Sequence, residues 1–342
     1  MKDKIAKIKV GFSVGDMNGI GPEVLLQSLS QTDMLDLFTP VIYGPVKNLL
    51  FTAKHLGIDI SFNKIKKPED SHLNKINVVD FSDNIPEIAF GELDKKMGAL
   101  AFLSIEKAVS DLNAGKIDVL VTPPINKEAI HSDSFTFMGH TDYIDSKVNG
   151  NAIMMMVSKE LRIALLTEHI PISSVTKKIT KKLVHDKVLN IHQTLIRDFQ
   201  IEKPKIAVLS IDPHAGDGGV IAGNDKDIMI PALREMQDSG VLVYGPFSSD
   251  SFFGSLEYKK YDITIASYHD QGLIPFKTLS FGMGVNYTSG LDRIRTSPDH
   301  GTAYSIAGKG LASKDSFLSA VFQALDIFKM RKTHDEYSKD KL

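Results

Sequence analysis

Cysteine is absent from the 342 residues of this sequence. Its absence excludes thiolate catalysis, CxxC redox chemistry, iron–sulfur clusters and zinc sites built on cysteine. Disulfides are excluded too, and a chain of this length does not need them, because it can bury about three quarters of its unfolded surface. Any metal ion held by the side chains must therefore be bound by histidine, aspartate or glutamate.

A charge excess of either sign is absent as well, since 40 Lys and Arg residues face 42 Asp and Glu residues. Nucleic-acid-binding domains usually show a strong basic excess, so we expect no such partner. The longest apolar runs, such as 152–157, are far shorter than the roughly 20 residues of a membrane helix. The first residues lack the apolar core of a signal peptide. We therefore expect no membrane association and predict a cytoplasmic protein.

Short apolar, β-branched runs alternate with amphipathic helical patterns along the chain, which predicts an α/β fold with a largely parallel sheet. Composition marks neither a linker nor a repeat, so two domains would be interleaved. The predicted strands are Ile8–Val14, Thr39–Tyr43, Ile76–Phe81, Ile117–Val121, Ala152–Val157, Arg162–Leu166, Lys205–Leu209, Val241–Tyr244 and Asp262–Ala266. The predicted helices are Pro22–Leu29, Lys96–Asn113, Val175–Phe199, Asp225–Ser239 and Lys314–Met330.

Three histidines, His169, His214 and His269, each follow a predicted buried strand. The carboxyl ends of parallel strands share one edge of a sheet, where ligands bind. Three imidazoles at such an edge suit a divalent metal with one position open for substrate. The chain has eleven histidines, so the alternative is that these three are unrelated polar residues in loops.

The nucleotide-binding glycine motifs GxGxxG and GxxxxGK[ST] do not occur. One glycine-rich loop, 15–23 (GDMNGIGPE), follows the first strand and opens a helix, where it suits either an anion or a tight turn. Polar loops are predicted at 122–127 (TPPINK), 139–142 (GHTD), 212–219 (DPHAGDGG) and 286–297 (NYTSGLDRIRTS). Because each of them follows an apolar run, we expect one rim of the fold to form a site.

Taken in order, these segments resemble the 4-hydroxythreonine-4-phosphate dehydrogenase family of vitamin B6 biosynthesis. The resemblance extends from the first strand to about residue 320 and rests on GDMNGIGPE, VTPPINKEAI, GHTDYI, DPHAGDGG, YHDQGLIPFK and GVNYTSGLDRIRTSPDHGTA. Departures are small: Met17 and Asn18 stand where the family commonly has Pro-Ala, and Glu168 precedes His169 where threonine is common.

The resemblance implies a divalent metal (Zn, Co, Mg or Mn) on His169, His214 and His269. It further implies a homodimer whose two chains both contribute to the active site. The substrate-binding residues that it implies are His140, Thr141, Lys277, Asn286 and Arg295.

The fold implied is that of the isocitrate/isopropylmalate dehydrogenase superfamily, with two interleaved α/β domains, a cleft between them and a non-Rossmann NAD site. We expect a cofactor domain of residues 1–127 plus 300–342, and a metal, substrate and dimer domain of residues 128–299. The segment 300–312 resembles the loop that holds the adenosine of NAD in isopropylmalate dehydrogenases. Its candidate cofactor residues are His300, Gly301, Ala303 and Gly308.

The implied reaction oxidises 4-phosphonooxy-L-threonine with NAD and releases CO2. Lys277, Asp270 and Asp250 are candidate proton acceptors that the sequence does not rank. Within the family, phosphorylated erythronate or an aromatic dihydrodiol is an alternative substrate. From another class, three histidines at strand ends would also serve a metallohydrolase that activates water.

Overall fold

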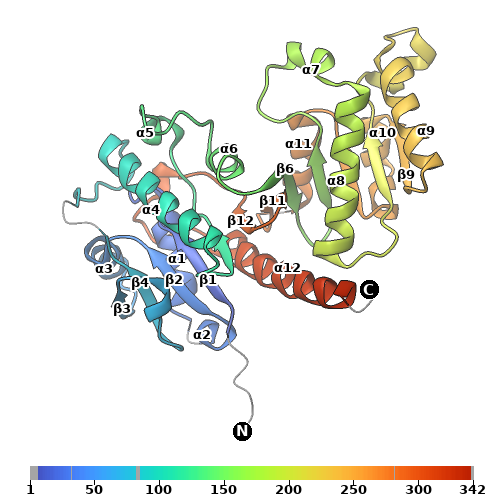
Figure 1. Ribbon diagram of the computed structural model, residues 1–342. Coiled ribbons are helices and arrows are strands. Elements are labelled where there is room, and N and C mark those ends of the chain that lie inside the picture. The colour runs from blue at the N-terminus through green and yellow to red at the C-terminus, as the bar shows by residue number, and fades with distance from the viewer. Residues whose placement is uncertain (1–6, 32, 82–84, 281, 340–342) are drawn as a thin grey trace. The chain divides into compact units, whose positions relative to one another are not determined.

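The computed structural model describes residues 7–31, 33–81, 85–280 and 282–339 (Figure 1). The chain forms two compact units: unit 1 comprises residues 1–150 and 291–328, and unit 2 comprises residues 151–290 and 329–342. The sequence suggested changes after residues 127 and 299, whereas the units change after residues 150, 290 and 328. The C-terminal helix therefore begins in unit 1 and ends in unit 2.

Unit 1 contains strands in the order β3-β4-β2-β1-β5-β12, and all five neighbouring pairs among them are parallel. Helix α4 packs on β1, β2 and β5 and crosses these strands in Figure 1. The strands are β1 (Lys9–Ser13), β2 (Thr39–Tyr43), β3 (Phe62–Ile65), β4 (Ile76–Val79), β5 (Val119–Val121) and β12 (Ile294–Pro298). The helices are α1 (Gly21–Leu29), α2 (Met34–Leu37), α3 (Val46–His55), α4 (Lys95–Asn113), α5 (Lys127–Ile130), α6 (His140–Asp145) and the first part of α12 (Asp315–Lys339).

Unit 2 contains strands in the order β11-β6-β7-β10-β8-β9. Strands β7, β10, β8 and β9 run parallel to one another, whereas β6 runs antiparallel to β7. The strands are β6 (Gly150–Val157), β7 (Arg162–Leu165), β8 (Ile206–Leu209), β9 (Val243–Phe247), β10 (Ile263–Ala266) and β11 (Val285–Leu291). The helices are α7 (Ile172–Lys178), α8 (Lys181–Phe199), α9 (Ile230–Asp238), α10 (Ser249–Gly254) and α11 (His269–Ser280). The predicted α/β fold is confirmed.

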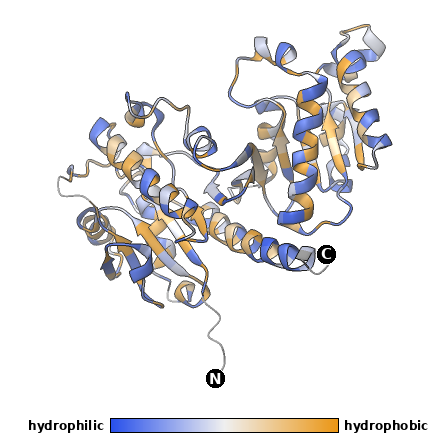
Figure 2. Cartoon of the chain, viewed as in Figure 1, coloured by the Kyte–Doolittle hydropathy of each residue, from blue (hydrophilic) through white to orange (hydrophobic). Residues whose placement is uncertain are grey.

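The predicted helix Val175–Phe199 is wrong, because two helices, α7 and α8, occupy this stretch. The chain becomes extended at Ile179, and the side chain of Thr180 caps α8 by accepting a hydrogen bond from the Leu183 amide. Figure 2 shows apolar residues along the strands and along one side of α8. The buried residues Val184, Val188, Ile191 and Leu195 recur every three or four positions, as an amphipathic helix requires.

The segment 286–297 is also not the polar loop that its composition suggested, since most of it belongs to β11 and β12. Its hydroxyl side chains are buried and bonded to carbonyl groups: Ser289 donates to Ile153 and Thr296 donates to Ala320. A buried hydroxyl with such a partner costs little, so polar residues are accommodated in these strands.

No helix in the described part of the chain combines the length and apolar composition needed to cross a membrane.

A buried ionic triad anchors the end of α12 in unit 2. Arg331 donates to Asp198 through Nε (2.6 Å) and Nη2 (3.0 Å) and to the hydroxyl of Tyr287 (2.9 Å). The Tyr287 hydroxyl in turn donates to Asp198, and all three residues are at most 6% exposed. The triad thereby joins α12, α8 and β11.

We expect Arg331→Met to lower the free energy of unfolding by about 3–5 kcal/mol, because it leaves the Asp198 carboxylate buried without its cation. Urea denaturation followed by circular dichroism measures the loss. Lys182→Met is the control, since Lys182 pairs with Asp186 on the exposed side of α8, and it should cost less than about 0.5 kcal/mol. A loss for Arg331→Met no larger than that of the control would contradict the assignment.

Candidate active site

The three strand-end histidines of unit 2 follow strands that are neighbours in the sheet. His169 follows β7, His269 follows β10 and His214 follows β8, and the order of these strands is β7-β10-β8. Ala266 at the end of β10 lies opposite Leu165 at the end of β7. The parallel strands thus end at the same edge, as the sequence predicted.

Two of these histidines lie close together, with the ring centres of His169 and His269 5.7 Å apart. Two imidazoles on one tetrahedral ion, with metal–nitrogen bonds of about 2.1 Å, have ring centres about 5 Å apart, so the pair fits a metal. His269 Nδ1 is 2.7 Å from Asp270 Oδ1. A carboxylate on one ring nitrogen orients the ring and leaves Nε2 as the ligating atom.

His214 lies in the turn between β8 and α9, near Asp250. Its φ is 52°, and residues 214–218 all have positive φ, a backbone arrangement that costs energy for the non-glycine members. Within the ranges that the structure describes, no three His, Asp or Glu side chains are placed to bind one ion. The structure therefore brings two of the three predicted ligands together, and the complete centre remains a prediction.

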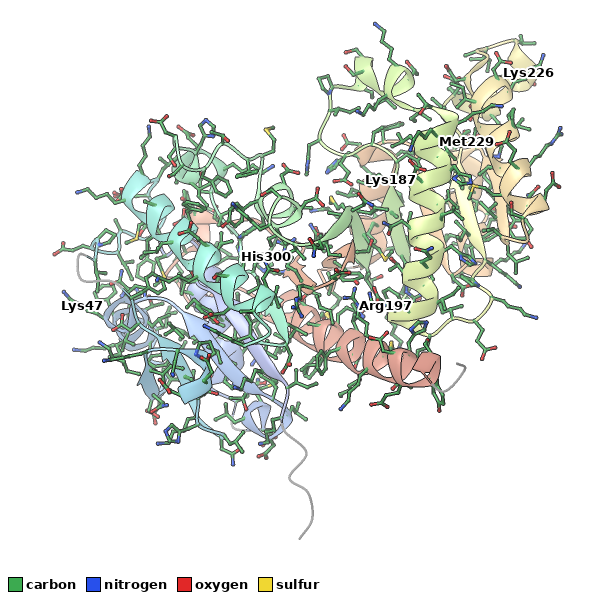
Figure 3. All side chains as sticks on the ribbon, viewed as in Figure 1. Lys47, Lys187, Arg197, Lys226, Met229 and His300 are labelled. Carbon is green, nitrogen blue, oxygen red and sulfur yellow. The ribbon has the colours of Figure 1, made fainter. Side chains whose placement is uncertain are left out.

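Glu168, the carboxylate beside His169, is bonded away from the histidines. Its Oε1 accepts from Lys187 Nζ (3.0 Å) and from the Met154 amide (3.2 Å). Lys187 reaches it from α8, on which Figure 3 labels it. The lysine neutralises the extra negative charge that Glu168 brings to this edge of the sheet.

Two of the candidate proton acceptors, Asp250 and Asp270, line one pocket of about 540 Å³ between α10 and α11, together with Gln271. A hydrogen bond from Ser248 lowers the pKa of Asp250, with smaller contributions from the Ser251 amide and from His214. Asp250 is therefore ionised at neutral pH. Lys277 lies on the exposed side of α11, a little over two turns after His269.

In unit 1, Arg295 on β12 is a buried cation held by hydroxyl groups. It is 2% exposed, and its Nε (2.9 Å) and Nη2 (2.6 Å) donate to Thr122, while its Nη1 lies 3.4 Å from the hydroxyl of Thr141. Burial lowers the pKa of Arg295 to about 9, because it removes water that would stabilise the charged guanidinium. Such a cation favours a bound anion.

His140, the first residue of α6, is buried beside this arginine. Among the residues described, its Nε2 finds no hydrogen-bond partner. Burial, and secondarily the charge of Arg295, hold the pKa of His140 well below its ordinary value, so the ring is neutral at pH 7. A neutral imidazole with an unused nitrogen is suited to a polar ligand.

Asn286, the remaining substrate-binding candidate, belongs to β11 in unit 2. Its Oδ1 is buried and has no hydrogen-bond partner within the described ranges. The amide therefore has an acceptor available.

The candidate cofactor loop of unit 1 is tied to the glycine-rich loop 15–23. The Ile20 amide donates to Thr302 O (2.9 Å), and the hydroxyl of Tyr304 donates to Asp16 (2.6 Å). A Cβ on Gly19 would lie 2.9 Å from Thr302, so this glycine is required for the close approach. The glycine-rich loop thus packs closely against the segment that contains the cofactor candidates.

The backbone conformation at two of these cofactor candidates, Ala303 and Gly308, is tightly restricted. Ala303 is left-handed (φ 43°), and a Cβ on Gly308 (φ 71°) would lie 2.5 Å from the ring of Phe90. His300 Nδ1 is 3.1 Å from Gly301 O.

Thr122 is a site residue that the sequence did not single out. It was visible only as part of TPPINK, directly after a strand. The parallel pairing of β5 with β12, in which Leu120 lies opposite Arg295, places Thr122 beside the guanidinium.

The model of the family described as pyridoxal phosphate biosynthetic protein PdxA matches residues 36–324. The chain belongs to this family. It is 45% identical, over 95% of its length and 90% of the relative, to 4-hydroxythreonine-4-phosphate dehydrogenase of Bacteroides thetaiotaomicron. It is 37% identical to D-threonate 4-phosphate dehydrogenase of Cupriavidus necator, over 93% and 96% of the two chains.

A solved structure agrees with this membership. The crystal structure of 4-hydroxythreonine-4-phosphate dehydrogenase from Klebsiella pneumoniae matches with a TM-score of 0.81 and 29% identity, over 96% of this chain and 99% of that one. This PdxA family member is therefore a dehydrogenase, an oxidoreductase that acts on a CH–OH group.

We expect inorganic phosphate to stabilise the protein through Arg295. At ten times its dissociation constant, phosphate should add about 1.4 kcal/mol to the free energy of unfolding, measured by thermal shift, and Arg295→Met should abolish this gain. Arg293→Met is the matched control directly before β12, where Arg293 bonds only to the Asn113 carbonyl among the contacts described, and it should keep the gain. An unchanged response in Arg295→Met would place the anion elsewhere.

Proposed function

We propose that this protein catalyses the NAD-dependent and divalent-metal-dependent oxidation of 4-phosphonooxy-L-threonine. Decarboxylation follows and gives 3-amino-2-oxopropyl phosphate and CO2, a step of pyridoxal 5'-phosphate biosynthesis in the cytoplasm. The observation that carries the proposal is the 45% identity to a relative of that name over nearly the whole chain. The proximity of His169 to His269 and the buried cation Arg295 support it.

The metal would be held by His169, His214 and His269, with Zn, Co, Mg and Mn as the ions to test. Three neutral imidazoles leave the ion its full charge, so when bound it supplies a Lewis acid for the substrate hydroxyl and for the ketone formed from it. The Nδ1 contact of His269 with Asp270 keeps this ring in the ligating orientation.

The substrate phosphate would be bound by Arg295, whose planar fork of donors matches phosphate oxygens. Thr141 and the neutral ring of His140 add hydrogen bonds to it. Lys277 and Asn286 are the other residues proposed to bind the substrate. The negative charge of the phosphate would stabilise the charged form of Arg295, which loses hydration on burial.

A proton leaves the substrate hydroxyl in this reaction, and Asp250, Asp270 and Lys277 remain the candidates to accept it. Asp250 is ionised, and both aspartates line the pocket between α10 and α11. Asp270 is already engaged with His269, which favours an orienting role for it.

NAD would bind at the loop that contains His300, Gly301, Ala303 and Gly308, in a non-Rossmann site of the isocitrate/isopropylmalate dehydrogenase type. Support comes from the fixed backbone of this loop and from its contacts with the glycine-rich loop 15–23. The NAD molecule would accept the hydride from the substrate carbon.

D-threonate 4-phosphate is a second candidate substrate, because a relative 37% identical to this chain carries that name. It bears a hydroxyl group where 4-phosphonooxy-threonine bears an amino group. The same metal, phosphate and cofactor residues would serve both molecules.

Formation of NADH separates these possibilities. With Co²⁺ or Mg²⁺ present, kcat/KM should be at least tenfold higher for 4-phosphonooxy-L-threonine than for D-threonate 4-phosphate or erythronate 4-phosphate. Chelation should abolish turnover, and added metal should restore it, because the Lewis acid is needed for both chemical steps.

A preference for D-threonate 4-phosphate would reassign the substrate within the family. Absence of NADH with all three substrates would overturn the proposed reaction, and full activity in metal-free protein would overturn the role of the metal.

We also propose that the enzyme is a homodimer in which both chains contribute to each active site. His140→Ala and His269→Ala should each be inactive alone, and mixing the two with subunit exchange should restore part of the activity in heterodimers. Failure to recover activity despite proven exchange would show that each chain holds a complete site.

A further inference from the structure

The three strand ends that precede the histidines are joined by buried side-chain hydrogen bonds. The hydroxyl of Thr167 donates to Ser267 O (2.7 Å), and the hydroxyl of Ser267 donates to Leu209 O (3.1 Å). Thr167 lies two residues before His169, and Ser267 lies two residues before His269. These bonds therefore join the ends of β7, β10 and β8.

Gln271 completes this network from the first turn of α11. Its Oε1 accepts from the Ser267 amide (2.6 Å), and its Nε2 donates to Ser210 O (2.8 Å) and to the hydroxyl of Ser249 (2.7 Å). Ser210 follows β8 on the way to His214, and Ser249 begins the helix that carries Asp250. The Gln271 side chain thus contacts the segments that carry the predicted metal ligands His269 and His214 and the segment that carries the candidate base Asp250.

Asp225 bonds to the two residues that follow Ser210, in the turn that carries His214. Its two carboxylate oxygens accept from the amides of Ile211 and Asp212, each at 2.9 Å, and the side chain is fully buried. Asp212 lies two residues before His214. The residue two positions before each histidine therefore makes a hydrogen bond: Thr167 through its hydroxyl, Ser267 and Asp212 through their amides.

The three contacts made at position 271 require a side-chain amide. It accepts from one amide and donates to a carbonyl and a hydroxyl at once, which neither a carboxylate nor an alkyl group does. Ser210 and Ser267 are buried, so loss of the amide would leave their backbone groups without a partner and allow the strand ends to shift.

We propose that Gln271 is a positioning residue for the metal centre. It fixes the segment of His269 relative to that of His214, so that the imidazoles close on one ion. This inference rests on the proposed function, since it presupposes the three-histidine centre.

Titration of the full-length protein with Co²⁺, by calorimetry and by the visible absorption of the bound ion, tests the inference. Gln271→Leu should bind Co²⁺ 10- to 100-fold more weakly than the wild type, the range seen when groups that orient metal ligands are removed. Gln271→Glu keeps the acceptor for Ser267 but loses the Nε2 donor, and its affinity should fall between the two.

Gln237→Leu is the matched control. Its Nε2 donates to Val243 O (2.7 Å) from α9 in the same unit, away from the strand-end histidines along the chain. This variant should keep the wild-type Co²⁺ affinity and absorption spectrum, even where its melting temperature falls as far as that of Gln271→Leu. A variant that is only less stable would show a lower melting temperature and an unchanged Co²⁺ affinity.

Wild-type affinity in Gln271→Leu would overturn the inference, and if that variant does not fold, wild-type affinity in Gln271→Glu would do so. The variant His269→Ala distinguishes a failure of the proposed metal centre from a failure of the positioning role of Gln271 alone. If the wild type binds no Co²⁺, or if His269→Ala binds it as tightly as the wild type, the proposed metal centre is wrong and the role of Gln271 falls with it. If His269→Ala loses binding and the Gln271 variants do not, only the positioning role is overturned.

Discussion

Three neighbouring strands of unit 2, β7, β10 and β8, run parallel and end level with one another at one edge of the sheet. This constraint brings the segments of His169, His269 and His214 to that one edge. An antiparallel strand among them would carry its histidine to the opposite edge, and β6, which is antiparallel to β7, bears no histidine. The hydrogen bonds of Thr167, Ser267 and Gln271 then join the ends of these strands, which the strand order places side by side.

The two units carry complementary parts of the proposed reaction. Unit 2 contributes imidazoles for a cation and carboxylates in an adjoining pocket. Unit 1 contributes a buried guanidinium that is held by the hydroxyl of Thr122, and a neutral histidine beside it. Burial is costly for a guanidinium, and a bound anion such as the proposed phosphate would offset part of that cost.

Much of this could be predicted from the sequence, because hydrophobic patterning is a local signal. The strand Thr39–Tyr43 was predicted with its observed ends, and the α/β alternation gave the fold class. Prediction failed where tertiary contacts override composition. The hydroxyl-rich segment 286–297 forms strands because its side chains find buried carbonyls, and the helical pattern 175–199 is divided by the cap that Thr180 provides.

The same distinction applies to the site. The strand-end positions of the three histidines were predictable, since parallel strands end at one edge of a sheet whatever their order in it. The environment of Arg295 was not, because its hydroxyl partner Thr122 is 173 residues away and enters only through the pairing of β5 with β12. The link between Gln271 and Ser210 depends in the same way on the pairing of β10 with β8.

The central claim is that three histidines from these strand ends bind one catalytic metal ion. Anomalous diffraction at the cobalt absorption edge, from crystals of the protein grown with Co²⁺, tests it most directly. The account predicts one strong peak per chain within bonding distance of nitrogen atoms of His169, His214 and His269. A peak held by other side chains, or no peak beside these histidines at saturating Co²⁺, would contradict it.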